Sequence, residues 1–296
     1  MNRTRARTPS RAASRLLLAL FVLIAGSACG DLGTEGVLER VVVVSKQINE
    51  FMYEIGAEDV IIARDLTSVY PPAIKEKTSV GYHRALSAEG IISTRPTLLL
   101  TDGNVGPDAV IQQVKDVGIP VLVMRGGSTV DSAQALMAAL GKRFHREAAA
   151  DSVIAVWRQG MASIGSDSAK WAGQPRPRVL MIHFGQIINN YLAVNRGSTA
   201  DRILHWAGGE NAIDSLGGMT RLTPELIARA APDVIIATDV GFDRFGSVEK
   251  FAQLPGVSLT PAGRDGRIYR VDESEIMYFG PRTPAAVKRI AGLLHP

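Results

Sequence analysis

The amino-acid sequence predicts an α/β protein made of two similar lobes with mainly parallel sheets, joined by a single long connecting helix. Three observations lead to this fold class. Short apolar runs alternate with helical patterns in both halves of the chain, a long helical stretch without proline separates the halves, and one short sequence pattern occurs in each half. With 296 residues, 46% of them hydrophobic, the chain is long enough for two compact lobes.

Residues 1–28 are expected to form a secretory signal peptide. Five arginines and no acidic residue lie within residues 1–15. The apolar run 16–26 that follows is shorter than the roughly 17–25 residues that span a bilayer. These five arginines account for the formal net charge of +4, so the rest of the chain is close to neutral. The charge distribution therefore argues against a nucleic-acid partner.

Cys29, the only cysteine, follows the apolar run after a few small residues. A single cysteine excludes a disulfide framework and any structural zinc site built from cysteines. Either Cys29 carries the lipid anchor of a bacterial lipoprotein, with residues 29–38 as a tether, or the chain is cleaved after Ala28 and released. Both alternatives place the protein in the periplasm or on the outer face of the cytoplasmic membrane.

The N-terminal lobe is expected to span residues 39–144. Continuous apolar runs separated by helical patterns indicate strands that are buried on both faces of a parallel sheet. The expected strands of this lobe are 41–44, 60–63, 97–101 and 120–124.

A connecting helix is expected over residues 145–172 and should lead into the C-terminal lobe, residues 173–296. Apolar residues recur there at helical spacing without proline, with Gly141 and Gly165 as weak points, and Pro175 marks the end. Two such lobes place a cleft between the carboxyl ends of their sheets, where small ligands bind in open α/β folds. The expected strands of the second lobe are 178–183, 234–238 and 267–271.

One sequence pattern recurs at a constant offset of 136 residues, which favours duplication of the lobe. In each copy a Ser or Thr can cap a short helix with Glu in its first turn, and a Pro then leads into an apolar strand. The matching residues are Leu86 and Leu222, Ser87 and Thr223, Glu89 and Glu225, Ile91 and Ile227, and Pro96 and Pro232.

The motifs of several enzyme classes do not occur in the sequence. There is no glycine-rich dinucleotide motif, no P-loop and no G-x-S-x-G nucleophile elbow. The five histidines show no zinc-protease spacing. These absences weaken the interpretation as a dinucleotide-binding, ATP-dependent or hydrolytic enzyme and argue against a zinc enzyme.

The segment Gly81-Tyr82-His83-Arg84 precedes the first capped helix, in a loop that should open onto the cleft. Together with Leu-Ser-Ala-Glu-Gly-Ile at 86–91, it resembles the periplasmic haem-binding proteins of bacterial haemin ABC importers. These form a branch of the siderophore and cobalamin binding-protein class, the class III periplasmic binding proteins. The resemblance covers residues 39–296, and it is supported by less specific motifs at 199–201, 207–209, 231–235, 254–257 and 279–283.

The resemblance implies that Tyr82 ligates ferric haem iron and that Arg84 supports this ligand. A phenolate is a hard anionic donor suited to Fe(III), and a neighbouring cation favours the phenolate form. The family commonly has an apolar residue at the position of His83. We expect His83 to face solvent or to support Tyr82, with ligation of the iron as the alternative.

His183 ends an expected strand of the second lobe, from where it can overlook the cleft. It is a candidate for a distal iron ligand or for the ligand of a second haem, and a purely structural role is the alternative. Haem also carries propionates, for which arginine is a suitable bidentate partner. The candidate propionate partners are Arg84, Arg125 and Arg244, and the candidate cleft walls are Tyr191, Met219, Phe242, Met277 and Tyr278.

In the wider class, one surface glutamate on each lobe docks against arginines of the membrane permease, and Glu89 and Glu225 match those positions. The sequence therefore predicts a monomeric extracytoplasmic protein that captures haem between its lobes and delivers it to an ABC importer. A carrier for an iron–siderophore or cobalamin is the first alternative. An enzyme or chelatase on the same fold is the second.

Overall fold

The computed structural model describes residues 39–168, 171, 173–184 and 191–296. The expected signal peptide, the tether and Cys29 lie outside these residues, and so does the final part of the expected connecting helix. Residues Arg40–Pro296 form one compact unit. Among the described helices, none combines the length and the apolar character that a membrane span requires.

The N-terminal lobe is built on a five-stranded sheet in the order β3-β2-β1-β4-β5, and all of its strand pairs are parallel. The parallel order agrees with the continuous apolar runs of the sequence. The strands are β1 (Val41–Val44), β2 (Ile61–Arg64), β3 (Thr78–Ser79), β4 (Leu98–Thr101) and β5 (Val121–Val123).

Helices cover both faces of this sheet because successive residues of a strand point to opposite sides. Val41 and Val43 of β1 pack with α2, α5 and α6, whereas Val42 and Val44 pack with α3 and α4. The helices of this lobe are α2 (Lys46–Glu54), η1 (Glu58–Val60), η2 (Pro72–Glu76), α3 (Ala88–Ile92), α4 (Asp108–Asp116) and α5 (Val130–Arg143).

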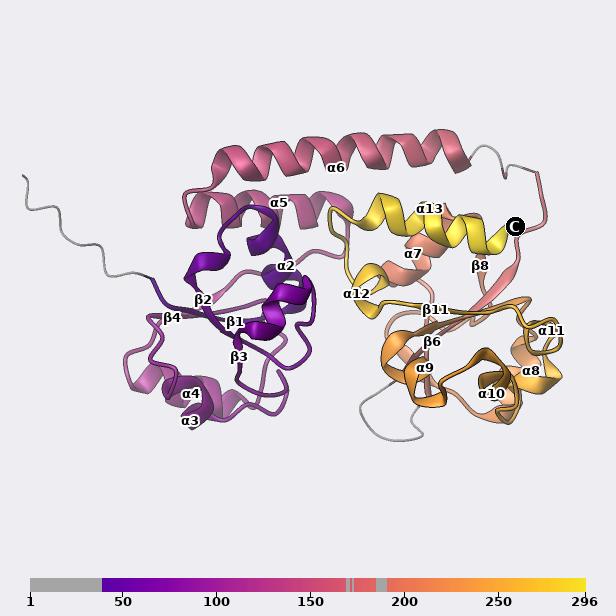
Figure 1. Cartoon of the computed structure of the whole chain (residues 1–296), viewed down its shortest axis with the longest axis horizontal. Coiled ribbons are helices and arrows are strands. Elements are labelled where there is room, and N and C mark those ends of the chain that lie inside the picture. The colour runs from indigo at the N-terminus through magenta and orange to yellow at the C-terminus, as the bar shows by residue number, and fades with distance from the viewer. Residues whose placement is uncertain (1–38, 169–170, 172, 185–190) are drawn as a thin grey trace, which may run out of the picture. The chain divides into compact units, whose positions relative to one another are not determined.

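A single long helix, α6 (Glu147–Ser168), connects the lobes and runs along α5 and α13 (Figure 1). It is separated from α5 at His145, which has a positive φ of 55°. Gly141, a weak point in the sequence, allows the close approach of α5 and α6: a Cβ at this position would lie 2.6 Å from the Cβ of Ala150. The predicted connecting helix is thus confirmed.

The C-terminal lobe has a mixed sheet in the order β11-β10-β6-β7-β9, with β8 paired to β6. Strands β6, β10 and β11 are parallel, whereas β7 is antiparallel to both of its neighbours. The sequence predicted the three parallel strands and missed β7, β8 and β9. The strands are β6 (Arg178–Phe184), β7 (Tyr191–Val194), β8 (Glu210–Asn211), β9 (Met219–Arg221), β10 (Val234–Thr238) and β11 (Ile268–Val271).

Eight helices of the described residues complete the C-terminal lobe. They are α7 (Thr199–Trp206), α8 (Pro224–Ala230), α9 (Asp239–Phe245), α10 (Val248–Ala252), η4 (Val257–Leu259), α11 (Pro261–Arg264), α12 (Glu273–Ile276) and α13 (Thr283–Leu294).

The predicted repeat is visible in the structure. Ser87 caps α3 by accepting a hydrogen bond from the Gly90 amide at 3.0 Å, and Thr223 caps α8 by accepting one from the Leu226 amide at 3.2 Å. Each helix is followed by a buried strand, β4 or β10. The two short helices therefore occupy corresponding places in the two lobes.

The lobes share one hydrophobic core and a buried polar junction. The core includes residues of β1, α2, α5, α6, β6, β10 and α13. Glu50 of α2, 1% exposed, accepts hydrogen bonds from the Tyr278 hydroxyl at 2.6 Å and from Arg282 Nε and Nη2 at 2.9 and 2.6 Å. The Arg282 guanidinium also lies 3.6 Å above the centre of the Tyr70 ring. These contacts join residues more than 200 positions apart in the sequence and tie the lobes together.

Candidate ligand-binding site

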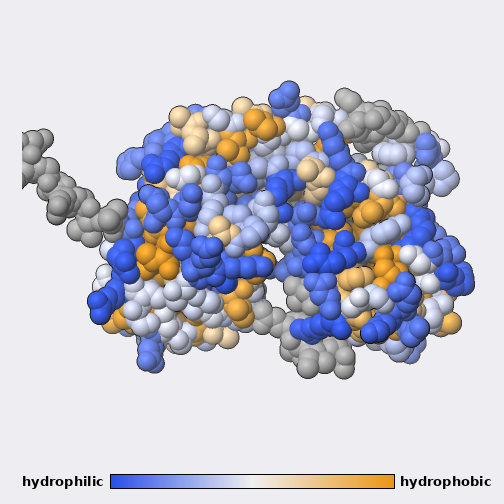
Figure 2. Space-filling model, in the orientation of Figure 1, coloured by the Kyte–Doolittle hydropathy of each residue, from blue (hydrophilic) through white to orange (hydrophobic). Residues whose placement is uncertain are grey.

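The candidate site lies at the carboxyl edge of the N-terminal sheet. Because the five strands are parallel, the segments that follow them leave the sheet along the same edge. The surface is hollowed between the two lobes (Figure 2). The segments leaving this edge begin at Ser45, Asp65, Val80, Asp102 and Met124.

Tyr82 lies half-buried in the loop that follows β3. The Leu66 amide donates a hydrogen bond to the Gly81 carbonyl, and the Ala85 amide donates one to the Tyr82 carbonyl, each at 2.8 Å. Gly81 has a φ of +101°, a conformation that side chains disfavour, so a glycine suits the turn that leads into Tyr82. Within the described part of the chain, the Tyr82 hydroxyl has no hydrogen-bond partner. Its oxygen is available to a ligand.

His83 packs beside Tyr82 and is held from the opposite side. The two rings meet edge to face with centroids 4.4 Å apart. His83 Nδ1 lies 3.4 Å from Thr67 Oγ1 and 4.0 Å from the buried carboxylate oxygen Oδ2 of Asp65. Burial lowers the pKa of His83, and Asp65 only partly opposes this effect. The geometry fits a neutral imidazole that orients the tyrosine ring.

Arg84 and Arg125 flank the turn after β4. Arg84 Nη2 donates a hydrogen bond to Asn104 Oδ1. Arg125 contacts the turn at Gly103, where an added Cβ would lie 3.0 Å from Arg125 Nη1. Both arginine side chains are exposed. Two cations from different strands therefore stand at the same edge as Tyr82.

The sequence analysis missed an ion pair at the junction of the two lobes. Lys46, the first residue of α2, places Nζ 2.5 Å from Oε1 of Glu273, the first residue of α12. The same carboxylate oxygen lies 4.0 Å from Nε2 of His183. Lys46 directly follows the central strand β1, and this position at the expected cleft edge was the signal that could have identified it.

His183 faces this ion pair from β6. Its Nδ1 lies 3.5 Å from Thr238 Oγ1, and its side chain is 16% exposed. Burial lowers the pKa of His183, and Glu273 partly opposes this shift. Lys46 lowers the pKa of both His183 and His83, so it is close to both histidines.

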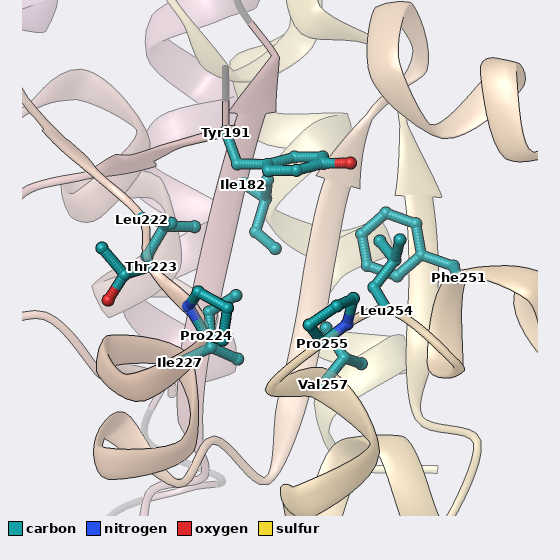
Figure 3. A pocket seen from close by; sticks show the side chains of 10 residues that line it. All are labelled: Ile182, Tyr191, Leu222, Thr223, Pro224, Ile227, Phe251, Leu254, Pro255 and Val257. Carbon is teal, nitrogen blue, oxygen red and sulfur yellow. The ribbon is translucent and has the colours of Figure 1, made fainter. Parts of the chain in front are cut away.

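Three of the predicted C-terminal residues lie at or near the surface. Tyr191 in β7 lines an apolar pocket of the C-terminal lobe together with Ile182 and Leu222 (Figure 3). Burial raises the pKa of Tyr191, and the neighbouring Arg244 opposes this shift. Arg244 is exposed near the end of α9, and Met219 is 38% exposed at the start of β9.

The other three predicted wall residues make contacts within the protein: Phe242 is buried, and Met277 and Tyr278 are half-buried. Phe242 is 9% exposed and stacks on Phe251 in the core of the C-terminal lobe. Met277 packs against the core shared by both lobes, and the Tyr278 hydroxyl is bound to Glu50. Phe242 is therefore removed from the candidate walls, because a sequence pattern does not distinguish a buried aromatic from one that faces a cleft. Tyr278 is half-buried and stays a candidate.

The two predicted docking glutamates are exposed in the first turns of their helices. The backbone amide of Glu225 and the Thr223 side chain lower the pKa of Glu225, which keeps this carboxylate ionised. The residues are thus presented to solvent in matching positions on the two lobes.

The comparison with protein families decides the class of this chain. Residues 41–275 match the family described as periplasmic binding protein. The chain belongs to this family. The family and its structural neighbours are binding proteins of transport systems, which agrees with the two-lobed α/β fold.

Solved structures and curated relatives of this periplasmic binding protein differ in their ligands. The periplasmic heme-binding protein BhuT, in complex with two hemes, is 30% identical with a TM-score of 0.76 over 86% of this chain and 99% of that chain. The apo form of RhuT from Roseiflexus sp. RS-1, a periplasmic heme-binding protein, is 28% identical with a TM-score of 0.78 over 87% of this chain and 98% of that chain.

Among the curated relatives, an uncharacterized ABC transporter substrate-binding lipoprotein of Bacillus subtilis, YvrC, is 24% identical over 87% of this chain and 80% of its own length. A vitamin B12-binding protein of Pectobacterium atrosepticum is 22% identical over 86% of this chain and 88% of its own length.

Proposed function

We propose that this periplasmic binding protein binds haem between its lobes, with Tyr82 as the iron ligand, and delivers it to an ABC importer. The observation that carries the proposal is the hydroxyl of Tyr82 at the carboxyl edge of the N-terminal sheet, which has no hydrogen-bond partner among the described residues. A phenolate there would hold Fe(III) without requiring the protein to perform chemistry. The similarity to two solved haem-binding proteins supports this ligand.

The polar surroundings of Tyr82 suit a ligand with carboxylates. Arg84 and Arg125 stand at the same sheet edge, and Arg244 is the corresponding candidate on the C-terminal lobe. Guanidinium groups form strong, bidentate contacts with carboxylates such as the haem propionates. Tyr191, Met219, Met277 and Tyr278 are the remaining candidates for the apolar contact.

The two histidines receive different roles in this proposal. His83, held at Nδ1 by Thr67 and Asp65, orients Tyr82. His183 is the candidate ligand from the C-terminal lobe, either for the same iron or for a second haem, because burial favours its neutral, metal-binding form. A complex with two hemes is reported for BhuT, to which this chain is 30% identical.

Cobalamin is the second candidate ligand, because vitamin B12-binding proteins are among the relatives. Cobalamin carries its own cobalt ligands and amide side chains, so it needs neither a phenolate nor a cluster of cations. The two ligands therefore make different demands on Tyr82.

The deciding experiment is an absorption titration of the purified mature protein with haemin and, separately, with cyanocobalamin. We expect tight haemin binding, and in Tyr82→Phe a loss of affinity on the order of 100-fold together with a changed visible spectrum. Tyr53→Phe, a tyrosine in α2, is the matched control and should bind haemin like the wild type. Tight cyanocobalamin binding that is unchanged in Tyr82→Phe would replace haem by cobalamin as the ligand.

Delivery requires a permease and an extracytoplasmic location. The substrate-binding lipoprotein among the relatives supports an ABC transporter as the partner system. Glu89 and Glu225 are the proposed contacts to the permease, one on each lobe. We propose export by residues 1–28, with either lipidation at Cys29 or cleavage after Ala28, and a monomeric mature protein.

A further inference from the structure

Lys46 lies at the carboxyl edge of the N-terminal sheet and has no role in the function proposed so far. It begins α2 directly after β1, the middle strand of the N-terminal sheet. Its side chain is 22% exposed, and its only ion-pair partner among the described residues is Glu273 across the lobe junction. A half-buried cation with a single exchangeable partner is suited to binding an anion.

A chain of hydrogen bonds leads from Ser45, the neighbour of Lys46, to Arg84. Ser45, the residue before it, donates a hydrogen bond from Oγ to Asp102 Oδ2 at 2.7 Å. Asp102 Oδ1 accepts from the Asn104 amide at 2.8 Å, and Asn104 Oδ1 accepts from Arg84. Lys46 and Arg84 therefore stand at opposite ends of one continuous polar edge.

Glu273 neutralises Lys46 and also lies next to His183. Its Oε1 is 2.5 Å from Lys46 Nζ and 4.0 Å from His183 Nε2. If another anion binds Lys46, Glu273 remains 4.0 Å from His183 Nε2, which can donate a hydrogen bond to it as long as this nitrogen does not ligate iron. The ion pair can thus open without leaving the half-buried carboxylate alone, a situation that would be costly.

We propose that Lys46 binds the carboxylate of a tetrapyrrole ligand. On binding, the ligand's carboxylate displaces the Glu273 carboxylate from Lys46. The inference rests on the proposed function and deepens it: Lys46 makes the site selective for tetrapyrroles with free carboxylates over those with amide or ester side chains. Glu273 acts as the internal competitor for the lysine. It keeps the ammonium paired while no ligand is bound.

The test compares haemin with its dimethyl ester, which has the same iron and ring but no carboxylates, in one detergent-containing buffer. The measured quantity is the ratio of the two affinities, obtained by absorption titration. In Lys46→Met we expect the haemin affinity to fall by about tenfold while the ester affinity stays unchanged. In Glu273→Gln we expect the haemin affinity to rise several-fold, again without an effect on the ester. Lys115→Met, an exposed lysine of α4, is the control and should change neither affinity.

The outcomes separate this inference from the proposed function. Haemin binding by the wild type with an unchanged haemin-to-ester ratio in Lys46→Met would overturn the role of Lys46 and leave haem binding standing. Equal losses for both ligands in Lys46→Met would assign the lysine a structural role and would also overturn the inference. A wild type that binds neither ligand would refute the proposed function itself. If Lys46→Met fails to fold, Glu273→Gln still tests the inference. A haemin affinity that does not rise in this variant would contradict a competition between Glu273 and the ligand's carboxylate for Lys46.

Discussion

At the scale of single residues, two tyrosines show how the surroundings decide what a phenol can do. Tyr82 is half-buried, and within the described residues nothing occupies its hydroxyl. Tyr278 is also half-buried, but its hydroxyl donates to the buried carboxylate of Glu50 at 2.6 Å. Burial raises the pKa of Tyr278 well above its ordinary value, and the negative Glu50 adds to the shift. Tyr278 therefore remains a neutral donor that supports the junction, whereas Tyr82 can become a ligand.

This contrast predicts opposite effects of the same substitution. Tyr278→Phe removes a hydrogen bond to a buried carboxylate, so we expect the free energy of unfolding to fall by about 1–3 kcal/mol while haemin affinity is retained. Urea unfolding followed by circular dichroism measures the first effect, and absorption titration measures the second. Tyr82→Phe is the matched control, and its stability should equal that of the wild type. A Tyr278→Phe protein of full stability would show that Arg282 alone satisfies Glu50.

At the scale of elements, the segment before η4 is held against the first turn of α8. Gly256 has a φ of +87°, and a Cβ there would lie 2.4 Å from the carbonyl oxygen of Pro224. Both its neighbours, Pro255 and Val257, line the apolar pocket beneath Tyr191, together with Pro224 itself (Figure 3). The pocket therefore depends on a glycine that allows two backbones to touch.

Replacing Gly256 by alanine should lower the free energy of unfolding by more than its left-handed backbone conformation alone explains. Gly266 also has a positive φ, +66°, but an added Cβ there would meet nothing within 4 Å. We expect Gly266→Ala to lose about 1 kcal/mol of unfolding free energy for the left-handed conformation. Gly256→Ala should lose roughly 2 kcal/mol more, because its Cβ overlaps a backbone atom. Thermal or urea unfolding of the two variants measures the difference, and equal losses would contradict the close approach.

At the scale of the whole molecule, the two lobes are united by a shared core, by the Glu50 junction and by α6. Each lobe nevertheless carries its own copy of the capped helix, α3 or α8, with an exposed glutamate in the first turn. A partner that contacts both glutamates must span both lobes. This arrangement suits recognition of the binding protein as one body.

Charge reversal at both glutamates should separate binding from delivery. In the double variant Glu89→Lys and Glu225→Lys, we expect unchanged haemin affinity and transport lowered by roughly tenfold, because like charges would oppose the permease arginines. Uptake by membrane vesicles that contain the cognate importer is the measurement. Glu249→Lys is the control, since Glu249 also begins a capped helix and is exposed. Normal transport by the double variant would remove these residues from the docking surface.

The sequence by itself determined the α/β class, the buried parallel strands, the long connecting helix and the repeated capped helix. These features depend on local patterns: continuous apolar runs, a proline-free helical stretch, and a cap with its glutamate. The short strands β3, β8 and β9 escaped because two or three mostly polar residues do not form such a pattern. Strand β7 was also missed, although its four residues are mostly apolar.

Only the tertiary structure decided which polar side chains meet. Lys46 and Glu273 are 227 residues apart in the sequence, and nothing local to either position indicates the other. The hydrogen bond from Tyr278 to Glu50, which makes Tyr278 part of the junction between the lobes, was likewise not indicated by any local pattern. Nor was the burial of Phe242 in a core. The pairs across the two lobes form because packing brings α2 and α12 together. A local sequence pattern does not indicate which distant residues will meet in space.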